Sequence, residues 1–221
     1  MTPFLVRRSG CLKGELRLSG DKSITHRAII VSSLACGLTR IKNPAVNQDC
    51  FSTIQVLRKL GIRITSGKST NLITVFGKGL YGFKKPKAAI YTGDSGTTMR
   101  LIAGLLAGQN FNCLLKADKS LSRRPMKRII IPLGLMGADI HGKRMGAEVY
   151  PPLKINGSIL KGINYKLPVA SAQVKSAIIL AGIYAKGATR IVEPLKTRDH
   201  TERMLQLFRA NLILKGNSIV V

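Results

Sequence analysis

One pattern of residues occurs three times along this chain, and an internal repeat of this length constrains the fold more than any single motif. The copies start with the segments at residues 23–37, 95–108 and 171–187. In each segment a serine precedes a stretch rich in Ala, Ile and Leu, and a glycine ends it. A short β-like stretch, a second and more amphipathic helix and another strand follow. We therefore expect three copies of one α/β unit.

A β-rich stretch also precedes each copy, so the full unit has the order βαβαββ. The predicted fold class is α/β (α+β), one lobe in which the three first helices, apolar nearly all round, form the centre. The sheets and the second helices are expected to surround them. The β-rich stretches lie at residues 14–20, 87–93 and 163–169. The three repeats are predicted at about residues 15–80, 85–157 and 160–221, after an N-terminal segment of residues 1–14.

Glycines mark the expected helix ends. The glycine that closes each first helix is predicted to have a positive φ angle. Gly61 and Gly137 follow the second helix in the first two copies, whereas the third copy has Arg209 at this position. If the position requires positive φ, Arg209 is strained by about 1 kcal/mol. The alternative is that the second helix of the third copy ends differently.

The starts of the three first helices carry groups suited to anions. A helix N-terminus presents unpaired N–H groups and a partial positive charge, and a serine there can cap the helix and donate to an oxyanion. Related helices of a pseudo-threefold lobe should direct these ends towards one face. That face would carry the segments "GDKS", "GDSGTT" and "ASAQVKS".

Cations lie beside these helix starts. Lys22 and Arg27 belong to the first, a basic loop spans residues 116–128, and Arg198 precedes a later helix. Arginine binds carboxylates and phosphates in bidentate geometry, and lysine binds them as a point charge. We interpret the arrangement as an anion-binding face. The simpler alternative is that Ser23 only caps its helix while Lys22 and Arg27 are solvated.

The charge balance agrees with anionic partners but does not identify them. Lys and Arg number 36 against 10 acidic residues, a formal net charge of +26. Such an excess attracts nucleic acids, acidic membrane surfaces, phosphorylated metabolites and acidic proteins. A specific nucleic-acid function is disfavoured, because zinc-module spacing and ribonucleoprotein-type aromatic motifs are absent from the sequence. Aromatic residues are only 5% of the chain, so base-stacking platforms are scarce.

Cysteine usage and apolar patterning indicate a cytoplasmic protein without a membrane span. The four cysteines show no C-x-x-C pairing and no histidine at metal-ligand spacing, so we expect reduced, mostly buried thiols and no metal. The N-terminal apolar run is too short for a signal peptide. Every apolar stretch falls short of the about 20 residues that a membrane helix needs.

Five blocks together resemble a known family. "LSGDKSITHRA", "GDSGTTMRL", "SLSRRPM", "PVASAQVKSAIILAG" and "TRDHTERML" are similar, in order and spacing, to the blocks of 5-enolpyruvylshikimate-3-phosphate synthase. The resemblance covers nearly the whole chain. It implies one lobe of the enolpyruvyl transferase fold and transfer of the enolpyruvyl group of phosphoenolpyruvate to the 5-hydroxyl of shikimate 3-phosphate. The family uses neither a metal nor an organic cofactor in this reaction.

The resemblance also implies roles for nine residues. Lys22 would contact both substrates, Ser23 and Arg27 the carboxylate of shikimate 3-phosphate, and Gly96 and Arg124 phosphoenolpyruvate. The segment "SAQVKS" would hold the phosphate of shikimate 3-phosphate and place its glutamine between the substrates, and the segment "TRDH" would add an arginine. The residues of these two segments are Ser171, Ala172, Gln173 and Arg198.

Family members have two similar lobes of three repeats, and this chain contains three repeats in all. The second lobe normally supplies the acid–base residues, so we expect weak shikimate 3-phosphate binding and negligible turnover by this chain alone. Residues 1–14 resemble the strand that pairs with the other lobe, and here should be frayed or repaired locally. A truncated product or incomplete gene model, half of a split enzyme with a second-lobe chain, and a degenerate lobe all remain open. So does membership of the sister family, UDP-N-acetylglucosamine enolpyruvyl transferase.

Overall fold

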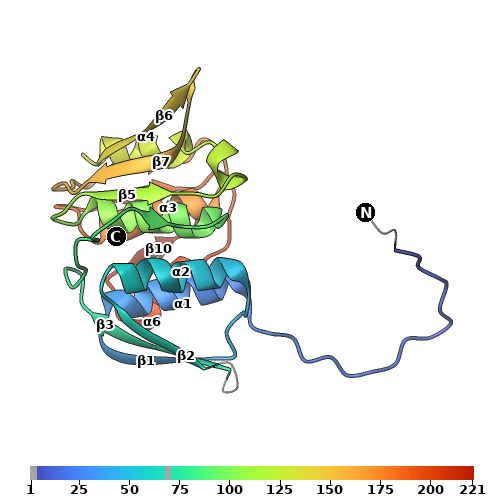
Figure 1. The fold of residues 1–221 in the computed structure, drawn as a ribbon. Coiled ribbons are helices and arrows are strands. Elements are labelled where there is room, and N and C mark those ends of the chain that lie inside the picture. The colour runs from blue at the N-terminus through green and yellow to red at the C-terminus, as the bar shows by residue number, and fades with distance from the viewer. Residues whose placement is uncertain (1–3, 68–70) are drawn as a thin grey trace.

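The computed structural model describes residues 4–67 and 71–221 of the chain. Residues 4–20 form an extended N-terminal arm that belongs to no helix or strand and is exposed over nearly its whole length. Figure 1 shows the arm leaving the start of α1 and running away from the folded body. The rest of the chain forms three sheets and six helices, counted over the described residues.

The first repeat begins directly with a helix. Asp21 caps α1, which is an apolar helix. An edge strand, an outer helix and a hairpin follow it along the chain. Its elements are α1 (Lys22–Leu34), β1 (Cys36–Lys42), α2 (Gln48–Lys59), β2 (Arg63–Gly67) and β3 (Leu72–Lys78).

The second and third repeats begin with a strand and have the full βαβαββ order. The second consists of β4 (Ile90–Tyr91), α3 (Gly96–Ala107), β5 (Cys113–Lys116), the short 3-10 helix η1 (Leu121–Arg123), α4 (Lys127–Leu135), β6 (Asp139–Met145) and β7 (Glu148–Asn156). The third consists of β8 (Asn164–Lys166), α5 (Ala172–Gly182), β9 (Arg190–Val192), α6 (His200–Leu207), β10 (Ile213–Lys215) and β11 (Ser218–Val220).

The three sheets share one strand order, except that the first sheet is one strand short. The second sheet has the order β4-β5-β7-β6, and the third β8-β9-β11-β10. In both, the strand before the inner helix pairs in parallel with the strand after it. The first sheet has the order β1-β3-β2, so β1 is an edge strand among the described residues. The strand predicted at residues 14–20 is therefore wrong for this structure, because the segment lies in the arm and pairs with no sheet.

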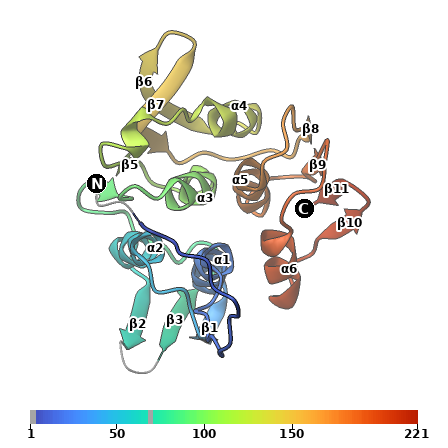
Figure 2. The same ribbon diagram turned by 90° about the vertical axis from the view of Figure 1, so that its right-hand side faces the viewer.

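The inner helices α1, α3 and α5 form the core, as predicted from their apolar residues. Figure 2 shows them nearly end-on, with the three sheets outside them. Their side chains are buried nearly all round, from Thr25 to Leu34 in α1 for example. α3 and α5 pack closely, because a Cβ atom added to Gly104 would lie 2.2 Å from the backbone oxygen of Ala177. Such contacts fix the relative position of the two helices.

The φ angles at the helix ends agree with the prediction after the outer helices and differ from it at the end of an inner helix. Gly61 and Gly137 have φ angles of +87° and +94°, and Arg209 has a φ of +60°. The third repeat therefore keeps the left-handed conformation with Arg209 in place of a glycine, so the prediction of a strained arginine applies. Gly108, in contrast, caps α3 with a φ of −92°, so the prediction of positive φ is wrong there. Gly37 and Gly187 do have positive φ, but each lies beyond the end of its inner helix.

All four cysteines are free, but they are not mostly buried. Cys50 and Cys113 are buried, and burial raises the pKa of each thiol to about 11. Cys11, in the arm, and Cys36, at the start of β1, are exposed. The burial prediction is therefore right for two of the four, because the other two lie in the arm and on the edge strand.

Candidate anion-binding site

The N-terminal ends of the three inner helices lie together at one end of the lobe. Gln173 of α5 donates from Nε2 to the Thr97 hydroxyl of α3 at 3.0 Å. Arg27 of α1 donates from Nη2 to the Ser176 hydroxyl of α5 at 2.9 Å. These contacts join the first turns of α3 and α5 and the second turns of α1 and α5. The predicted common face is therefore formed.

The caps of these helices differ from the prediction at one position. Ser95 and Ser171 cap α3 and α5 by accepting from the backbone N–H groups three residues later. In α1 the cap is Asp21, which accepts from the Ile24 N–H at 2.8 Å. Ser23 is not a cap, because an extra residue separates the acid from the serine and a carboxylate is a strong cap. Its hydroxyl has no hydrogen-bond partner among the described residues, and so stays available to a ligand.

The two cations of the α1 start lie at different depths. Lys22 is half exposed, and its Nζ lies 2.9 Å from Oδ2 of Asp49 on α2. Arg27 is 3% exposed. Its Nε donates to the Thr201 hydroxyl at 2.6 Å, and its Nη1 donates to the Ser23 carbonyl at 3.1 Å. Arg27 is thus held by α5, α6 and its own helix, whereas Lys22 can exchange Asp49 for another anion.

The electrostatic surroundings of Arg27 bring Arg198 into the same site. Burial holds the pKa of Arg27 below its ordinary value, and the carboxylate of Glu202 offsets part of this shift. The positive charge of Arg198 lowers the pKa further, so the two guanidinium groups lie within electrostatic range. Arg198 itself is exposed in the loop before α6. An anion placed between these two guanidinium groups would interact favourably with both of them.

Around α3 the site contains an arginine that sequence reasoning missed. Arg100 donates from Nη1 to Oε1 of Gln173 at 2.6 Å, which fixes the glutamine that also donates to Thr97. Gly96 lies directly beneath this group, because a Cβ there would be 2.6 Å from Nη1 of Arg100. A signal existed in the sequence, since positions four residues apart share a helix face. Gly96 was a candidate, and Arg100 is one turn further on.

The segment predicted as a basic loop, which in the structure contains η1 and the start of α4, adds two more guanidinium groups. Arg124 is exposed just after η1, and its Nη2 donates to the Ser120 hydroxyl at 3.3 Å. Asp94 anchors the start of η1 by accepting from the Leu121 N–H at 3.0 Å. Burial lowers the pKa of Arg100, and the charges of Arg124 and Arg128 lower it further. The α3 side of the face therefore holds three arginines in electrostatic range.

The remaining candidates form the start of α5. Ser171 is its cap and Ala172 its first residue, and both are partly accessible. Free N–H groups of this turn, together with Arg27 and Arg198 nearby, provide a second place for an anion. The structure thus brings all nine predicted residues to the helix starts or to the loops beside them. The arrangement can bind a ligand with more than one anionic group.

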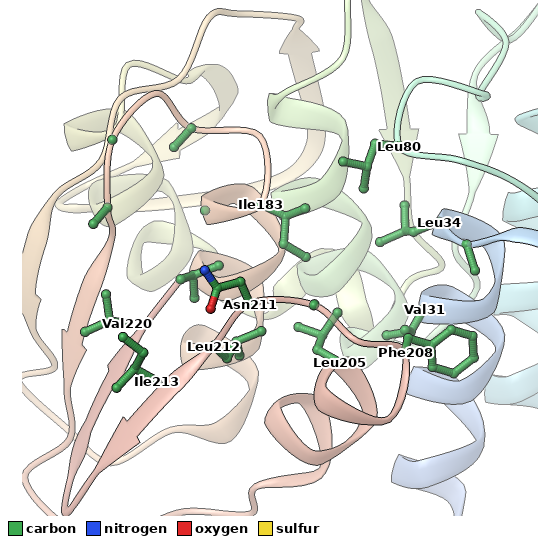
Figure 3. Close-up of a pocket in the computed structure, with 17 residues that line it drawn as sticks. Val31, Leu34, Leu80, Ile183, Leu205, Phe208, Asn211, Leu212, Ile213 and Val220 are labelled. Atoms are coloured by element: carbon green, nitrogen blue, oxygen red, sulfur yellow. The ribbon is translucent and has the colours of Figure 1, made fainter.

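A large apolar pocket lies away from this face. Its volume is about 640 Å³, and Figure 3 shows the residues that line it. Leu34 near the end of α1 and Ile183 just after α5 belong to this lining, so the pocket is at the opposite ends of the inner helices. Asn211 is the polar side chain among the labelled ones. A pocket without cations does not suit the anionic ligands that the helix starts favour.

The described part of the chain contains neither a membrane-spanning helix nor a cluster of metal-ligating side chains. In residues 4–67 and 71–221 no helix has the length and apolar character needed to cross a membrane. Over the same residues, no group of three or more His, Cys, Asp or Glu side chains is placed to hold a metal ion.

Comparison with known proteins places this chain in a family. A family model described as EPSP synthase (3-phosphoshikimate 1-carboxyvinyltransferase) matches residues 6–221. Among curated proteins, the 3-phosphoshikimate 1-carboxyvinyltransferase of Thermodesulfovibrio yellowstonii is 49% identical over 215 residues, which are 97% of this chain and 49% of that protein. The Bacillus subtilis protein of the same name is 48% identical over 210 residues, 95% of this chain and 48% of the relative.

Solved structures agree with these sequence matches. EPSP synthase from Acinetobacter baumannii superposes with a TM-score of 0.89 at 45% identity, over 94% of this chain and 46% of that one. The enolpyruvyl transferase NikO from Streptomyces tendae has a TM-score of 0.69 at 16% identity, over 95% and 48% of the two chains, which shows a shared fold. This chain spans about half the length of the curated relatives it matches. The chain belongs to the EPSP synthase (3-phosphoshikimate 1-carboxyvinyltransferase) family.

Proposed function

We propose that this chain forms the shikimate 3-phosphate side of an enolpyruvyl transferase site. Completed by a second lobe, the site would transfer the enolpyruvyl group of phosphoenolpyruvate to the 5-hydroxyl of shikimate 3-phosphate and release phosphate. The observation that carries the proposal is the convergence of three helix starts with Lys22, Arg27, Arg100 and Arg198 at one end of the lobe. Both substrates carry a carboxylate and a phosphate, which such a face can bind.

We propose for these residues the roles that the resemblance implies, and their positions at the helix starts support those roles. Lys22 is accessible and can reach both substrates, while Ser23 and Arg27 bind the carboxylate of shikimate 3-phosphate. Gly96 and Arg124 lie on the phosphoenolpyruvate side, where Arg100 adds a third group. The start of α5 binds the phosphate of shikimate 3-phosphate, with the glutamine between the substrates and the α6 loop as a further contact. These last residues are Ser171, Ala172, Gln173 and Arg198.

A binding experiment tests the substrate side. We expect calorimetric titration with shikimate 3-phosphate at moderate salt to show saturable binding by the chain. Lys22→Ala should weaken it at least about tenfold, because a charge-assisted hydrogen bond is lost. Lys59→Ala is the matched control, since it removes the same charge from the far end of α2. Arg27→Ala should also abolish binding, provided that circular dichroism shows a folded variant. Equal affinities of the Lys22 and Lys59 variants would contradict the proposal.

A second lobe as partner belongs to the same proposal, and the open first sheet supports it. Among the described residues, β1 has a free edge where the other two sheets carry a parallel strand, and the segment that precedes α1 points away from the body. Residues 15–18 alternate charged and apolar side chains, with Leu16 and Leu18 exposed. A strand without a sheet and a sheet edge without a strand both favour pairing with another lobe. We propose that residues 1–14 and the strand-like stretch after them join that lobe.

Turnover measurements test the need for the second lobe. The chain alone is expected to show negligible turnover, because the acid–base groups of the family lie in the other lobe. Adding the separately expressed second half of the Bacillus subtilis relative should restore phosphate release from phosphoenolpyruvate in the presence of shikimate 3-phosphate. Robust turnover by the chain alone would show that the second lobe is unnecessary. A cytoplasmic location completes the proposal, and the four free cysteines support it.

A further inference from the structure

A buried lysine joins the two cations that face shikimate 3-phosphate in the proposed site. Lys175 is the fourth residue of α5, and its side chain is 1% exposed. Its Nζ is 2.8 Å from Oε2 of Glu193, in the loop after β9, and 2.6 Å from Oε1 of Glu202 on α6. Both carboxylates are buried as well. The lysine therefore ties the loop after β9 and helix α6 to the inner helix.

This cluster is balanced only when Arg27 is counted. One buried cation between two carboxylates leaves a negative charge, and an uncompensated buried charge costs several kcal/mol. The carboxylate of Glu202 favours the charged form of Arg27, so the arginine lies within its electrostatic range. Two cations, Arg27 and Lys175, thus face two anions, Glu193 and Glu202. Removing Lys175 would leave the carboxylate of Glu202 with Arg27 as a buried cation within electrostatic range.

Glu193 transmits the position of Lys175 to the Arg198 loop. Its second oxygen, Oε1, accepts from the backbone N–H of Thr197 at 3.2 Å and also from the Thr197 hydroxyl. Thr197 directly precedes Arg198 in the chain. Lys175 holds the other oxygen of the same carboxylate, so the orientation of Glu193 depends on the lysine. The loop that carries Arg198 is thereby fixed to α5.

Helix α6 transmits the position of Lys175 to Arg27. Glu202 holds the helix against Lys175, and its neighbour Thr201 accepts from Nε of Arg27. Ser176 donates to the Ala172 carbonyl, so the Thr201 hydroxyl donates to Ser176 at 2.7 Å and Ser176 accepts from Arg27 as well. Every hydroxyl proton in this group has one acceptor. The guanidinium group is thus fixed by two hydroxyls whose spacing depends on the contact between α5 and α6.

We propose that Lys175 is a positioning residue that sets the placement of Arg27 and Arg198 for a doubly anionic ligand. It touches neither the ligand face nor the reacting atoms, and acts through Glu202 and Glu193. The proposal rests on the proposed function, because it assigns the two arginines to shikimate 3-phosphate. Without the lysine, Arg27 turns towards the unpaired carboxylates and the Arg198 loop loses its anchor.

The test compares Lys175→Met with the double variant Lys175→Met/Glu202→Gln. Methionine keeps the length of the side chain, and the glutamine restores the charge balance among the buried groups. We expect shikimate 3-phosphate affinity to fall at least about tenfold in the single variant and to recover only in part in the double variant, because the glutamine removes the excess negative charge while the Arg198 loop stays without its anchor. A residue that only stabilises the fold would lower the melting temperature of the folded variant without changing its affinity. Unchanged affinity of the folded single variant would overturn the proposal, and full recovery in the double variant would overturn its loop part.

Two further measurements keep the test decisive if Lys175→Met does not fold. Thr197→Val removes one contact of Glu193 on a half-buried residue, and should weaken binding about threefold through the Arg198 loop. Unchanged affinity of this variant would contradict the loop part of the proposal. The Nε–H resonance of Arg27 reports its bond to Thr201, and should lose protection from solvent exchange in Glu202→Gln. If the wild-type chain does not bind shikimate 3-phosphate, the proposed function fails, while this resonance still tests the positioning.

Discussion

The inner and outer helices come from the same repeat, yet they tolerate change differently. α1, α3 and α5 are surrounded by protein, and at Gly104 the backbone of α3 lies close to the backbone of α5 at Ala177. α2, α4 and α6 keep one face towards solvent, with exposed apolar side chains such as Phe51, Ile131 and Leu207. The sequence of a helix alone does not determine whether a substitution is tolerated, because the neighbouring elements determine which atoms the new side chain contacts.

The largest expected effect separates the two groups of helices directly. Gly104→Ala in α3 places a Cβ 2.2 Å from a backbone oxygen, which cannot move without shifting α5. We expect a loss of roughly 4 kcal/mol in the free energy of unfolding, above the usual cost of overpacking because the clash involves backbone. Urea denaturation with circular dichroism measures it.

The matched control lies in an outer helix. Gly134 is in α4, and a Cβ added there meets nothing within 4 Å. Gly134→Ala should therefore leave stability unchanged or raise it by up to about 1 kcal/mol, through helix propensity and lower unfolded-state entropy. Similar losses in both variants would show that inner and outer helices do not differ in tolerance.

A second prediction concerns a histidine buried in an inner helix. His26 is fully buried in α1, its Nδ1 is 2.7 Å from the Thr53 hydroxyl, and its Nε2 has no partner among the described residues. Burial lowers its pKa to about 4 from an ordinary 6.5. Between these values the unfolded chain binds a proton that the folded chain does not, so stability falls as the pH falls. The expected loss from pH 7 to pH 4 is about 3 kcal/mol.

The measurement is the pH dependence of the free energy of unfolding in wild type and in His26→Gln. Carboxylates also titrate in this range, so the difference between the two curves isolates the histidine. Parallel curves for wild type and His26→Gln would contradict the prediction.

The repeat predicted the helices better than the strands, for a physical reason. An inner helix satisfies its own backbone hydrogen bonds, so an apolar stretch such as residues 23–37 indicates it locally. A strand needs a neighbour, and residues 14–20 have the pattern of a strand without a paired edge in this chain. The sequence shows the alternation of Leu16 and Leu18 but cannot show where the partner edge lies.

Prediction of the site residues has the same limit, because contacts between distant segments cannot be predicted from the sequence. Lys22, Arg27 and Arg198 could be assigned to one face because helix starts of a repeat point the same way. The cap of α1 was predicted at Ser23, by analogy with the other two repeats, and this was wrong because the backbone places Asp21 at the cap position. Arg100 was missed because its role depends on contact with Gln173, which lies in the next repeat.

The smallest expected effect concerns the end of an outer helix. Arg209 has a φ of +60°, where Gly61 and Gly137 stand in the other two repeats. A side chain in this conformation costs roughly 1 to 2 kcal/mol, and a glycine loses part of that gain through unfolded-state entropy. Arg209→Gly should therefore raise the free energy of unfolding by about 0.5 to 1 kcal/mol.

The inverse change, Gly137→Ala, should lower the free energy of unfolding by about 1 kcal/mol. Its new Cβ would make only an ordinary contact at 3.4 Å, so the cost is backbone strain. Chemical denaturation of both variants measures these differences, and changes of the same sign would mean that the three helix ends are not equivalent.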